Sequence, residues 1–254
     1  MNESQISATR PDLLILVTRF NWPHEKWASV DESEYRAWLE ERVKAFAGLT
    51  VPSVNNCTKK PDYWYVLCSS LENFGLRQKL EGLLGGLPFK LVEYSGKSLT
   101  ATIAEQLSTL VFPVRVRMTR LDSDDLIAAD YFARLKSVPC DEDEGSRGLV
   151  VSFPGGCNFV QDENCYYYSS YPDNPFLSLV EDLNEAEEAR TVYHRMHTEM
   201  LSAGFAVRFV RSFRPMWASV LHGSTTQNQS LAQTNQIALA DSRLCSAIFG
   251  CRAD

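Results

Sequence analysis

Apolar and polar positions divide the first half of the chain into alternating strand-like and helix-like segments. Apolar runs bounded by polar residues predict buried strands at 12–18 and 63–68. Two further strands are predicted at 89–94 and at 114–120, where apolar and polar residues alternate. Apolar residues three and four positions apart predict helices at 31–46, 76–84 and 99–110. Because strands and helices alternate, we expect an α/β fold with a mostly parallel central sheet flanked by helices.

The pattern of the second half is less regular. It predicts helices at 126–136, 186–203 and 237–249, and strands at 148–153, 165–171 and 207–210. Residues 141–147 are expected to form an acidic loop, and residues 176–183 an apolar helical turn. Residues 216–222 lead into a polar tail, 223–236, which we expect to be mobile until a ligand orders it. We expect one domain over 1–254, with two halves that meet near residue 125.

Composition and charge exclude several classes of protein. The 254 residues are 44% hydrophobic and 22% charged, which is typical of a globular protein. The net charge of -7 argues against general binding to a nucleic acid backbone. The seven cysteines form no C-x-x-C pair, and the polar N-terminal residues contain no apolar signal core. We therefore expect a cytoplasmic protein with reduced cysteines and no transmembrane segment.

An acidic turn follows the predicted strand 114–120. Asp122, Asp124 and Asp125 place three carboxylates within four residues. Carboxylates at this density repel one another unless a cation lies among them. A hard divalent ion held there could face the phosphates of a nucleotide, because the carboxyl ends of parallel strands form ligand-binding crevices.

Other readings of the acidic turn exist. Asp124 or Asp125 could cap a following helix in a solvated turn. An EF-hand loop is disfavoured, since its sixth position would be Ile127 rather than Gly. A phosphatase that forms an aspartyl-phosphate also uses Asp-x-Asp after a strand, but it usually carries the motif on its first strand.

Three further positions are candidates for a site. Arg19 and Asn21 follow the first predicted strand, where they could grip a pyrophosphate or a base edge. His222 follows an apolar segment and could complete a metal shell beside the acidic turn. Glu181, with Asp182 next to it, is a carboxylate in an apolar segment and could act as a general base.

Several short motifs together resemble the rhamnosyltransferase family of bacteria. They are Val17-Thr18-Arg19-Phe20-Asn21, Trp38-Leu39-Glu40-Glu41-Arg42, Val51-Pro52-Ser53-Val54, Arg120-Leu121-Asp122-Ser123-Asp124-Asp125 and Leu221-His222-Gly223. These motifs run from about residue 13 to 225, and the first and fourth in this order are the most specific. The resemblance implies a GT-A-like glycosyltransferase. In such a protein residues 1–125 bind a nucleotide-diphosphate sugar, and residues 126–254 bind a glycan or another hydroxyl acceptor.

The resemblance also implies roles for individual residues. The donor-binding residues would be Thr18, Arg19, Asn21, Arg120 and Asp122. The ligands of Mn²⁺ or Mg²⁺ would be Asp122, Asp124, Asp125 and His222, with Asp124 and Asp122 favoured. The base for direct displacement with inversion would be Glu181, or else Asp182.

Two other classes of function remain open at this stage. A metal-dependent phosphohydrolase would release phosphate from simple esters. A catalytically inactive carbohydrate-binding protein would bind glycans without turnover and would not need the acidic turn.

Overall fold

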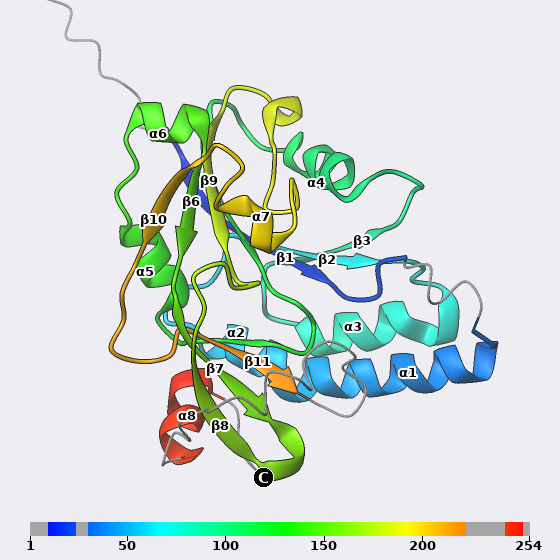
Figure 1. Ribbon diagram of the computed structural model, residues 1–254. Coiled ribbons are helices and arrows are strands. Elements are labelled where there is room, and N and C mark those ends of the chain that lie inside the picture. The colour runs from blue at the N-terminus through cyan, green and yellow to red at the C-terminus, as the bar shows by residue number, and fades with distance from the viewer. Residues whose placement is uncertain (1–9, 24–29, 222–241, 251–254) are drawn as a thin grey trace, which may run out of the picture.

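A seven-stranded sheet forms the centre of the molecule (Figure 1). The computed structural model describes residues 10–23, 30–221 and 242–250. The strands of this sheet, in spatial order, are β10 (Ala206–Phe209), β6 (Leu149–Ser152), β9 (Ser178–Leu183), β4 (Val114–Arg120), β1 (Asp12–Arg19), β2 (Tyr63–Cys68) and β3 (Phe89–Glu93). Only β9 runs antiparallel to its neighbours, β4 and β6. The prediction of an α/β fold with a mostly parallel central sheet is confirmed.

Helices cover both faces of this sheet (Figure 1). On one face lie α1 (Glu32–Ala45), the π-helical turn Phe46–Thr50, α2 (Val51–Asn56) and α3 (Leu76–Leu84), and on the other lies α4 (Leu99–Leu107). Alternation along β1 supplies both cores: Leu14 and Leu16 pack with the first group, whereas Ile15 and Val17 pack with α4. This period of two follows from the pleat of a strand buried on both faces.

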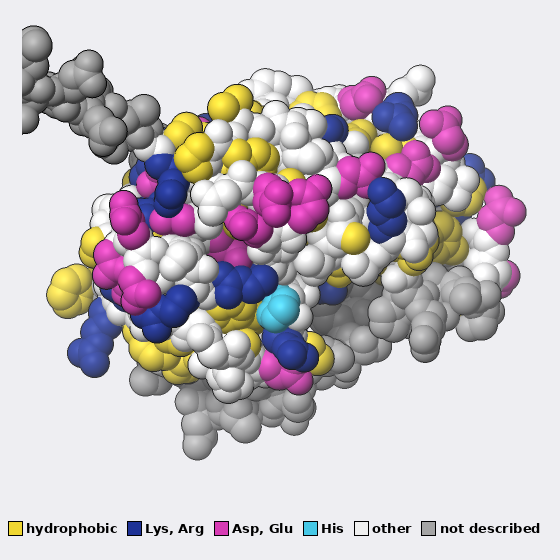
Figure 2. Space-filling view, turned by 90° about the horizontal axis from the view of Figure 1, so that it is seen from above, with side chains coloured by type: hydrophobic (Ala, Val, Ile, Leu, Met, Phe, Trp, Pro, Cys, Tyr) yellow, Lys and Arg dark blue, Asp and Glu magenta, His cyan; other side chains and the backbone are white. Residues whose placement is uncertain are grey.

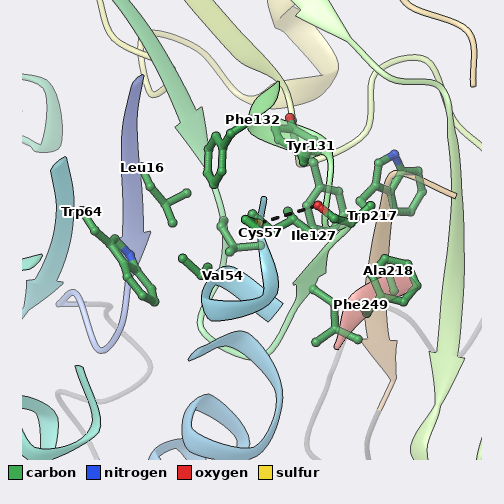
Figure 3. Close-up of a cluster of buried hydrophobic side chains, with 14 of the residues drawn as sticks. Leu16, Val54, Cys57, Trp64, Ile127, Tyr131, Phe132, Trp217, Ala218 and Phe249 are labelled. Atoms are coloured by element: carbon green, nitrogen blue, oxygen red, sulfur yellow. Dashed lines mark hydrogen bonds between the residues drawn. The ribbon is translucent and has the colours of Figure 1, made fainter. Parts of the chain in front are cut away.

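A second, four-stranded sheet lies beside the first. Its order is β5 (Leu126–Ile127), β11 (Trp217–Leu221), β7 (Gly155–Val160) and β8 (Cys165–Ser170). The helix α8 (Ser242–Phe249) packs against it, with the Phe249 ring stacked 6.0 Å from that of Tyr166. One buried cluster joins the two sheets through α2, with Cys57 between Val54 and Ile127 (Figure 3). Burial raises the pKa of the Cys57 thiol to about 12, so it acts as a packing residue.

Four predictions of local structure are wrong. Residues 126–136 begin as strand β5 and become helical only in α5 (Tyr131–Ser137). Residues 141–147 form the helix α6 (Glu142–Arg147), because Asp141 and Glu144 make a capping box. Residues 176–183 contain strand β9, and residues 186–203 contain only a 3₁₀ turn and the short α7 (His197–Met200). In the last two cases tertiary pairing overrides the local pattern.

The surface charge and the lengths of the helices bear on two classes of partner, nucleic acid and membrane. On the face drawn in Figure 2, acidic and basic side chains are interspersed rather than gathered into one basic patch. Among the helices of the described ranges, none combines the length and the apolar character needed to cross a bilayer.

Candidate functional site

The ends of three parallel strands bring the candidate residues together. In the register of the sheet, Val17 of β1 lies opposite Arg120 of β4, and Arg19 lies opposite Leu67 of β2. The chain continues in register beyond β4, because the Leu121 amide donates to the Val17 carbonyl at 3.0 Å. The residues that follow these strands therefore share the carboxyl edge of the sheet, where ligands bind in open α/β sheets.

Asp122 lies between two arginines at this edge. Arg120 donates to Asp122 from Nη2 at 2.8 Å and from Nε at 3.4 Å, and Arg19 Nη2 lies 3.4 Å from both carboxylate oxygens. Burial alone would raise the pKa of Asp122, but the charges of Arg120 and Arg19 outweigh it and hold the pKa well below its usual range. Asp122 is therefore an ionised anchor for two guanidinium groups.

Both guanidinium groups also lie over one aromatic ring. The Arg19 and Arg120 guanidinium carbons are 5.4 and 5.5 Å from the centre of the Tyr193 ring. Tyr193 comes from the segment between β9 and α7, so it reaches this edge from a distant part of the sequence. Burial raises the pKa of Tyr193 to about 12, and its hydroxyl stays protonated at neutral pH.

Asp124 faces the helix α1. Arg42 Nη1 donates to Asp124 Oδ2 at 3.2 Å, while the Arg42 guanidinium lies 5.1 Å from the Trp38 ring centre. A cavity of about 720 Å³ runs along this helix, lined in part by Trp38, Arg42 and Gln161. Arg42 therefore connects Asp124 to the wall of this cavity.

Asp125 bonds to groups outside the acidic turn. Its Oδ1 accepts from the Val220 amide at 2.9 Å, and its backbone carbonyl accepts from the Thr50 hydroxyl at 2.9 Å. Burial, followed by the charges of Asp124 and Asp122, raises the pKa of Asp125 well above its ordinary value. Asp125 joins the acidic turn to β11 and to the π-helical turn Phe46–Thr50.

The cations that balance the acidic turn are arginines. Asp122 is paired with Arg19 and Arg120, and Asp124 with Arg42. Arginine side chains thus supply the cations expected among these carboxylates, and the metal ion stays a prediction. Within the described ranges no three His, Cys, Asp or Glu side chains converge as a metal site. The predicted ligand His222 lies outside the described residues.

Thr18 and Asn21 support the frame of the site. Thr18 is fully buried, and its hydroxyl accepts from Trp64 Nε1 at 3.0 Å. The Asn21 amide donates to Tyr35 and Ser69 at 3.0 and 3.1 Å, and its oxygen accepts from the Ser69 amide at 3.1 Å. These bonds tie the ends of β1 and β2 together, so Arg19 is the residue of this group that faces the acidic turn.

The predicted bases Glu181 and Asp182 lie at the wrong end of the sheet. They face Val116 and Arg115 in the register of β9 with β4. Asp122 follows Val116 by six residues, or about 20 Å of extended strand. Both carboxylates have partners of their own: Glu181 pairs with Arg190 at 2.8 Å, and Asp182 with Arg115 at 2.6 Å. Their assignment as base beside the acidic turn is corrected accordingly.

Sequence reasoning missed three residues of the site, namely Arg42, Tyr193 and His197. Arg42 ends one of the motifs that carry the family resemblance. The sequence does not show that its charge partner is Asp124, because the two residues are far apart in the chain. His197 begins α7 and packs edge-on against Tyr171, with the ring centres 6.3 Å apart. Burial and the charge of Arg120 lower the pKa of His197, so its ring is neutral at pH 7. The predicted helix 186–203, which would carry His197, does not form over its whole length.

Solved structures with a similar fold were found, at low similarity. S. aureus TarS, residues 1–349, is 10% identical with a TM-score of 0.44; the match covers 82% of this chain and 60% of that one. The inositol-1-phosphate CTP transferase from T. maritima is 14% identical with a TM-score of 0.39, covering 82% of this chain and 89% of that one. Similarities of this size do not indicate shared substrates. The chain thus spans about 60% of the TarS structure, and no curated protein matches its sequence.

A family model gives a firmer result. The model described as "Putative rhamnosyl transferase" matches residues 13–236, from the start of β1 to beyond β11. The match includes every residue placed above at the carboxyl edge of the sheet. By this match the chain belongs to that rhamnosyl transferase family.

Proposed function

We propose that the protein is a glycosyltransferase that moves a sugar from a nucleotide-diphosphate donor to a hydroxyl acceptor. Rhamnose is the first sugar to test. Family membership supports this class of reaction. The observation that carries the proposal is the pairing of Arg19 and Arg120 on Asp122 at the carboxyl edge of a mostly parallel sheet. Two guanidinium groups held side by side suit the charge and geometry of a diphosphate.

The arginines act on the leaving group. As the bond to the sugar breaks, negative charge grows on the diphosphate, and fixed cations stabilise it without reorganising at that moment. Asp122 fixes Arg19 and Arg120 beforehand, at 3.4 and 2.8 Å. The buried Nε atoms of Arg19 and Arg42 have no hydrogen-bond partner among the described residues, which leaves donors on this edge for a ligand.

A divalent ion is proposed at this edge, at a site shared with the phosphates of the donor. Mn²⁺ or Mg²⁺ bound against phosphates needs only one or two protein carboxylates, and Asp124 with Asp122 would hold it. When bound, the ion supplies further positive charge to the departing diphosphate. Asp125, whose Oδ1 accepts from the Val220 amide, is a further proposed ligand. His222 remains a proposed further ligand.

A different residue replaces Glu181 as the proposed base. His197 is the described histidine whose ring is influenced by Arg120 and Asp122. It is half-buried and neutral at pH 7, so Nδ1 or Nε2 can accept the proton of an acceptor hydroxyl during a direct displacement with inversion.

Calorimetry tests the donor class. UDP, GDP and dTDP are titrated into the protein, each with and without Mn²⁺, and one nucleotide is expected to bind with micromolar affinity. Asp124→Asn should lose the part of the affinity that Mn²⁺ adds, whereas the exposed Asp162→Asn serves as the control and should keep it. If none of the three nucleotides binds, or if Asp124→Asn turns over at the rate of the unchanged protein, the proposal fails.

The other two classes give distinct results. A phosphohydrolase would release phosphate from p-nitrophenyl phosphate, and an inactive carbohydrate-binding protein would bind glycans equally well after Asp124→Asn. Either result in place of nucleotide binding would replace the glycosyltransferase proposal.

A further inference from the structure

We propose that Tyr193 is a positioning residue, which holds Arg19 and Arg120 in the orientation that binds the donor diphosphate. The inference rests on the proposed function and adds to it a part of the chain that lies about 70 residues beyond the acidic turn. Its basis is the contact of one ring with two guanidinium groups, at 5.4 and 5.5 Å. The ring attracts each cation and narrows the positions that it can take.

Asp122 alone would not fix both arginines. Two like charges that share one carboxylate repel each other, and Arg19 reaches Asp122 only at 3.4 Å. A guanidinium on a long side chain has many rotamers, so its alignment with a phosphate costs conformational entropy. The Tyr193 ring reduces that cost because it offers Arg19 and Arg120 a second common contact.

The ring is itself fixed at its far end. The Tyr193 hydroxyl donates to the Val17 carbonyl at 3.4 Å, on the strand that carries Arg19. The backbone amide of Tyr193 donates to the Thr191 hydroxyl at 3.2 Å. The ring is therefore attached both to β1 and to its own segment.

Thr191 holds this segment in an unusual backbone conformation. Its φ is +66°, in the left-handed region, which is rare for a β-branched residue, and its side chain is fully buried. Such strain persists only where the surroundings impose it, and it is concentrated at functional sites. The conformation turns the chain so that Tyr193, two residues later, reaches the carboxyl edge.

Glu181 imposes the conformation. Its carboxylate accepts from the Thr191 amide at 3.3 Å, from the Arg190 amide at 3.3 Å and from Arg190 Nε at 2.8 Å. Glu181 is buried on β9, an inner strand of the sheet, so the Thr191 turn is attached to that strand. The carboxylate that the sequence offered as a base is thus a second positioning residue, which acts through Thr191 and Tyr193.

Inorganic pyrophosphate is the probe for this inference, because it needs no knowledge of the base or sugar. Its affinity is measured by calorimetry for the unchanged protein, Tyr193→Leu and Tyr193→Phe, with thermal unfolding recorded for each. Tyr193→Leu should bind pyrophosphate about tenfold more weakly, since two cation–π contacts are lost. Tyr193→Phe keeps the ring and should weaken binding only about twofold. Tyr168→Leu, an exposed tyrosine on β8, is the matched control and should bind as the unchanged protein does.

The outcomes separate the two proposals. If the unchanged protein binds pyrophosphate and Tyr193→Leu binds it equally well, the positioning role is overturned while the donor site stands. If Tyr193→Phe loses as much affinity as Tyr193→Leu, the ring contact is not the cause and the inference is wrong. If the unchanged protein binds neither pyrophosphate nor a nucleoside diphosphate, the proposed function itself fails.

A second variant covers the case in which Tyr193→Leu does not fold. Glu181→Gln leaves the ring intact but replaces one acceptor oxygen with an amide group, which loosens the Thr191 turn. It should weaken pyrophosphate binding several-fold, whereas Asp182→Asn, the next residue on β9, alters a separate pair with Arg115 and should leave it unchanged. Equal affinity in both variants contradicts the role of Glu181.

Discussion

At the scale of single residues, charge at the acidic turn is balanced within the protein. Asp122 and Asp124 each face arginine, and Asp125 is buried against a backbone amide. The sequence shows the three carboxylates, but it does not show that their partners lie on β1, α1 and β4. Arginines held by the acidic turn can bind a phosphate directly. The turn can therefore bind an anion through its arginines as well as a metal ion through its carboxylates.

Replacing Thr191 by valine tests the strained turn. The change keeps the shape but removes the hydroxyl that accepts from the Tyr193 amide. We expect a loss of about 1–3 kcal/mol in the free energy of unfolding, because a buried donor is left without a partner. Urea unfolding measures it.

Thr102→Val is the matched control for this prediction. Thr102 is also buried, but its hydroxyl has no partner among the described residues, so the change should be neutral or stabilising. Equal losses in the two variants would show that the Thr191 hydroxyl bond contributes nothing specific.

His197→Gln tests the proposed base. We expect kcat to fall about 10²-fold or more while the affinity for the nucleotide stays within a factor of about two. In the unchanged enzyme the rate should fall as the pH drops through the pKa of His197, which lies below its ordinary 6.5, because the protonated ring cannot accept a proton. The pH profile of kcat measures this, and an acidic limb that survives in His197→Gln would assign the base elsewhere.

At the scale of elements, the antiparallel pairing of β9 with β4 determines which carboxylates lie near the acidic turn. Its residues Leu179 and Val180 pack on opposite faces of the sheet, which is the period of a strand between two neighbours. Over eight residues the same apolar letters also suit a helical turn, so local pattern could not separate the two. Once β9 pairs with β4 in this direction, Glu181 must lie far from Asp122.

The pairing of β7 with β11 depends on Gly156. A Cβ added at Gly156 would lie 2.2 Å from the Trp217 ring, which stacks on Phe176 at 4.8 Å and donates to the Phe153 carbonyl. Gly156→Ala should therefore cost about 1–3 kcal/mol in the free energy of unfolding through overpacking. Thermal unfolding measures it.

Gly155 provides a neighbouring control. A Cβ there would meet the Tyr168 hydroxyl at 3.5 Å, an ordinary contact, so Gly155→Ala should have a small effect. If the two alanine variants have equal free energies of unfolding, the contact of Gly156 with the Trp217 ring does not require glycine and the prediction is wrong.

At the scale of the whole molecule, Arg117 joins parts that are distant in sequence. From the middle of β4 it donates to Asp12 at the start of β1, and to the carbonyls of Leu135 and Val138 at the end of α5, each at 2.9 Å. Its side chain is only 3% exposed, so these bonds are not replaced by water. Arg117 therefore links β4 to the start of β1 and to the end of α5.

Arg117→Met should therefore destabilise the protein strongly. Asp12 would lose a partner and the carbonyls of Leu135 and Val138 would each lose a buried donor, which costs about 3–5 kcal/mol. Arg77→Met is the control, because Arg77 is exposed and its pairs with Glu72 and Glu93 are 3.7 and 3.9 Å long, worth less than about 1 kcal/mol. Urea unfolding of both variants measures the difference, and similar losses would contradict the connecting role.

The sequence by itself determined the first half of the fold and the location of the site. Strands β1 to β4 and their helices follow from short-range periodicity, and the order of parallel strands places Arg19 and Asp122 on one edge. These features depend on neighbours within a few residues, which a sequence displays directly. The resemblance of five motifs added the family.

The tertiary structure alone decided which residues complete the site. Arg42, Tyr193 and His197 reach it because α1 packs on the acidic turn and because Glu181 redirects the chain at Thr191. The contacts of Arg42 with Asp124 and of Tyr193 with Arg120 join residues more than 70 positions apart, and their free energy comes from pairing and burial that no local pattern contains. The same long-range pairing places Glu181, a predicted base, against Arg190 and Thr191 in the segment that leads to Tyr193.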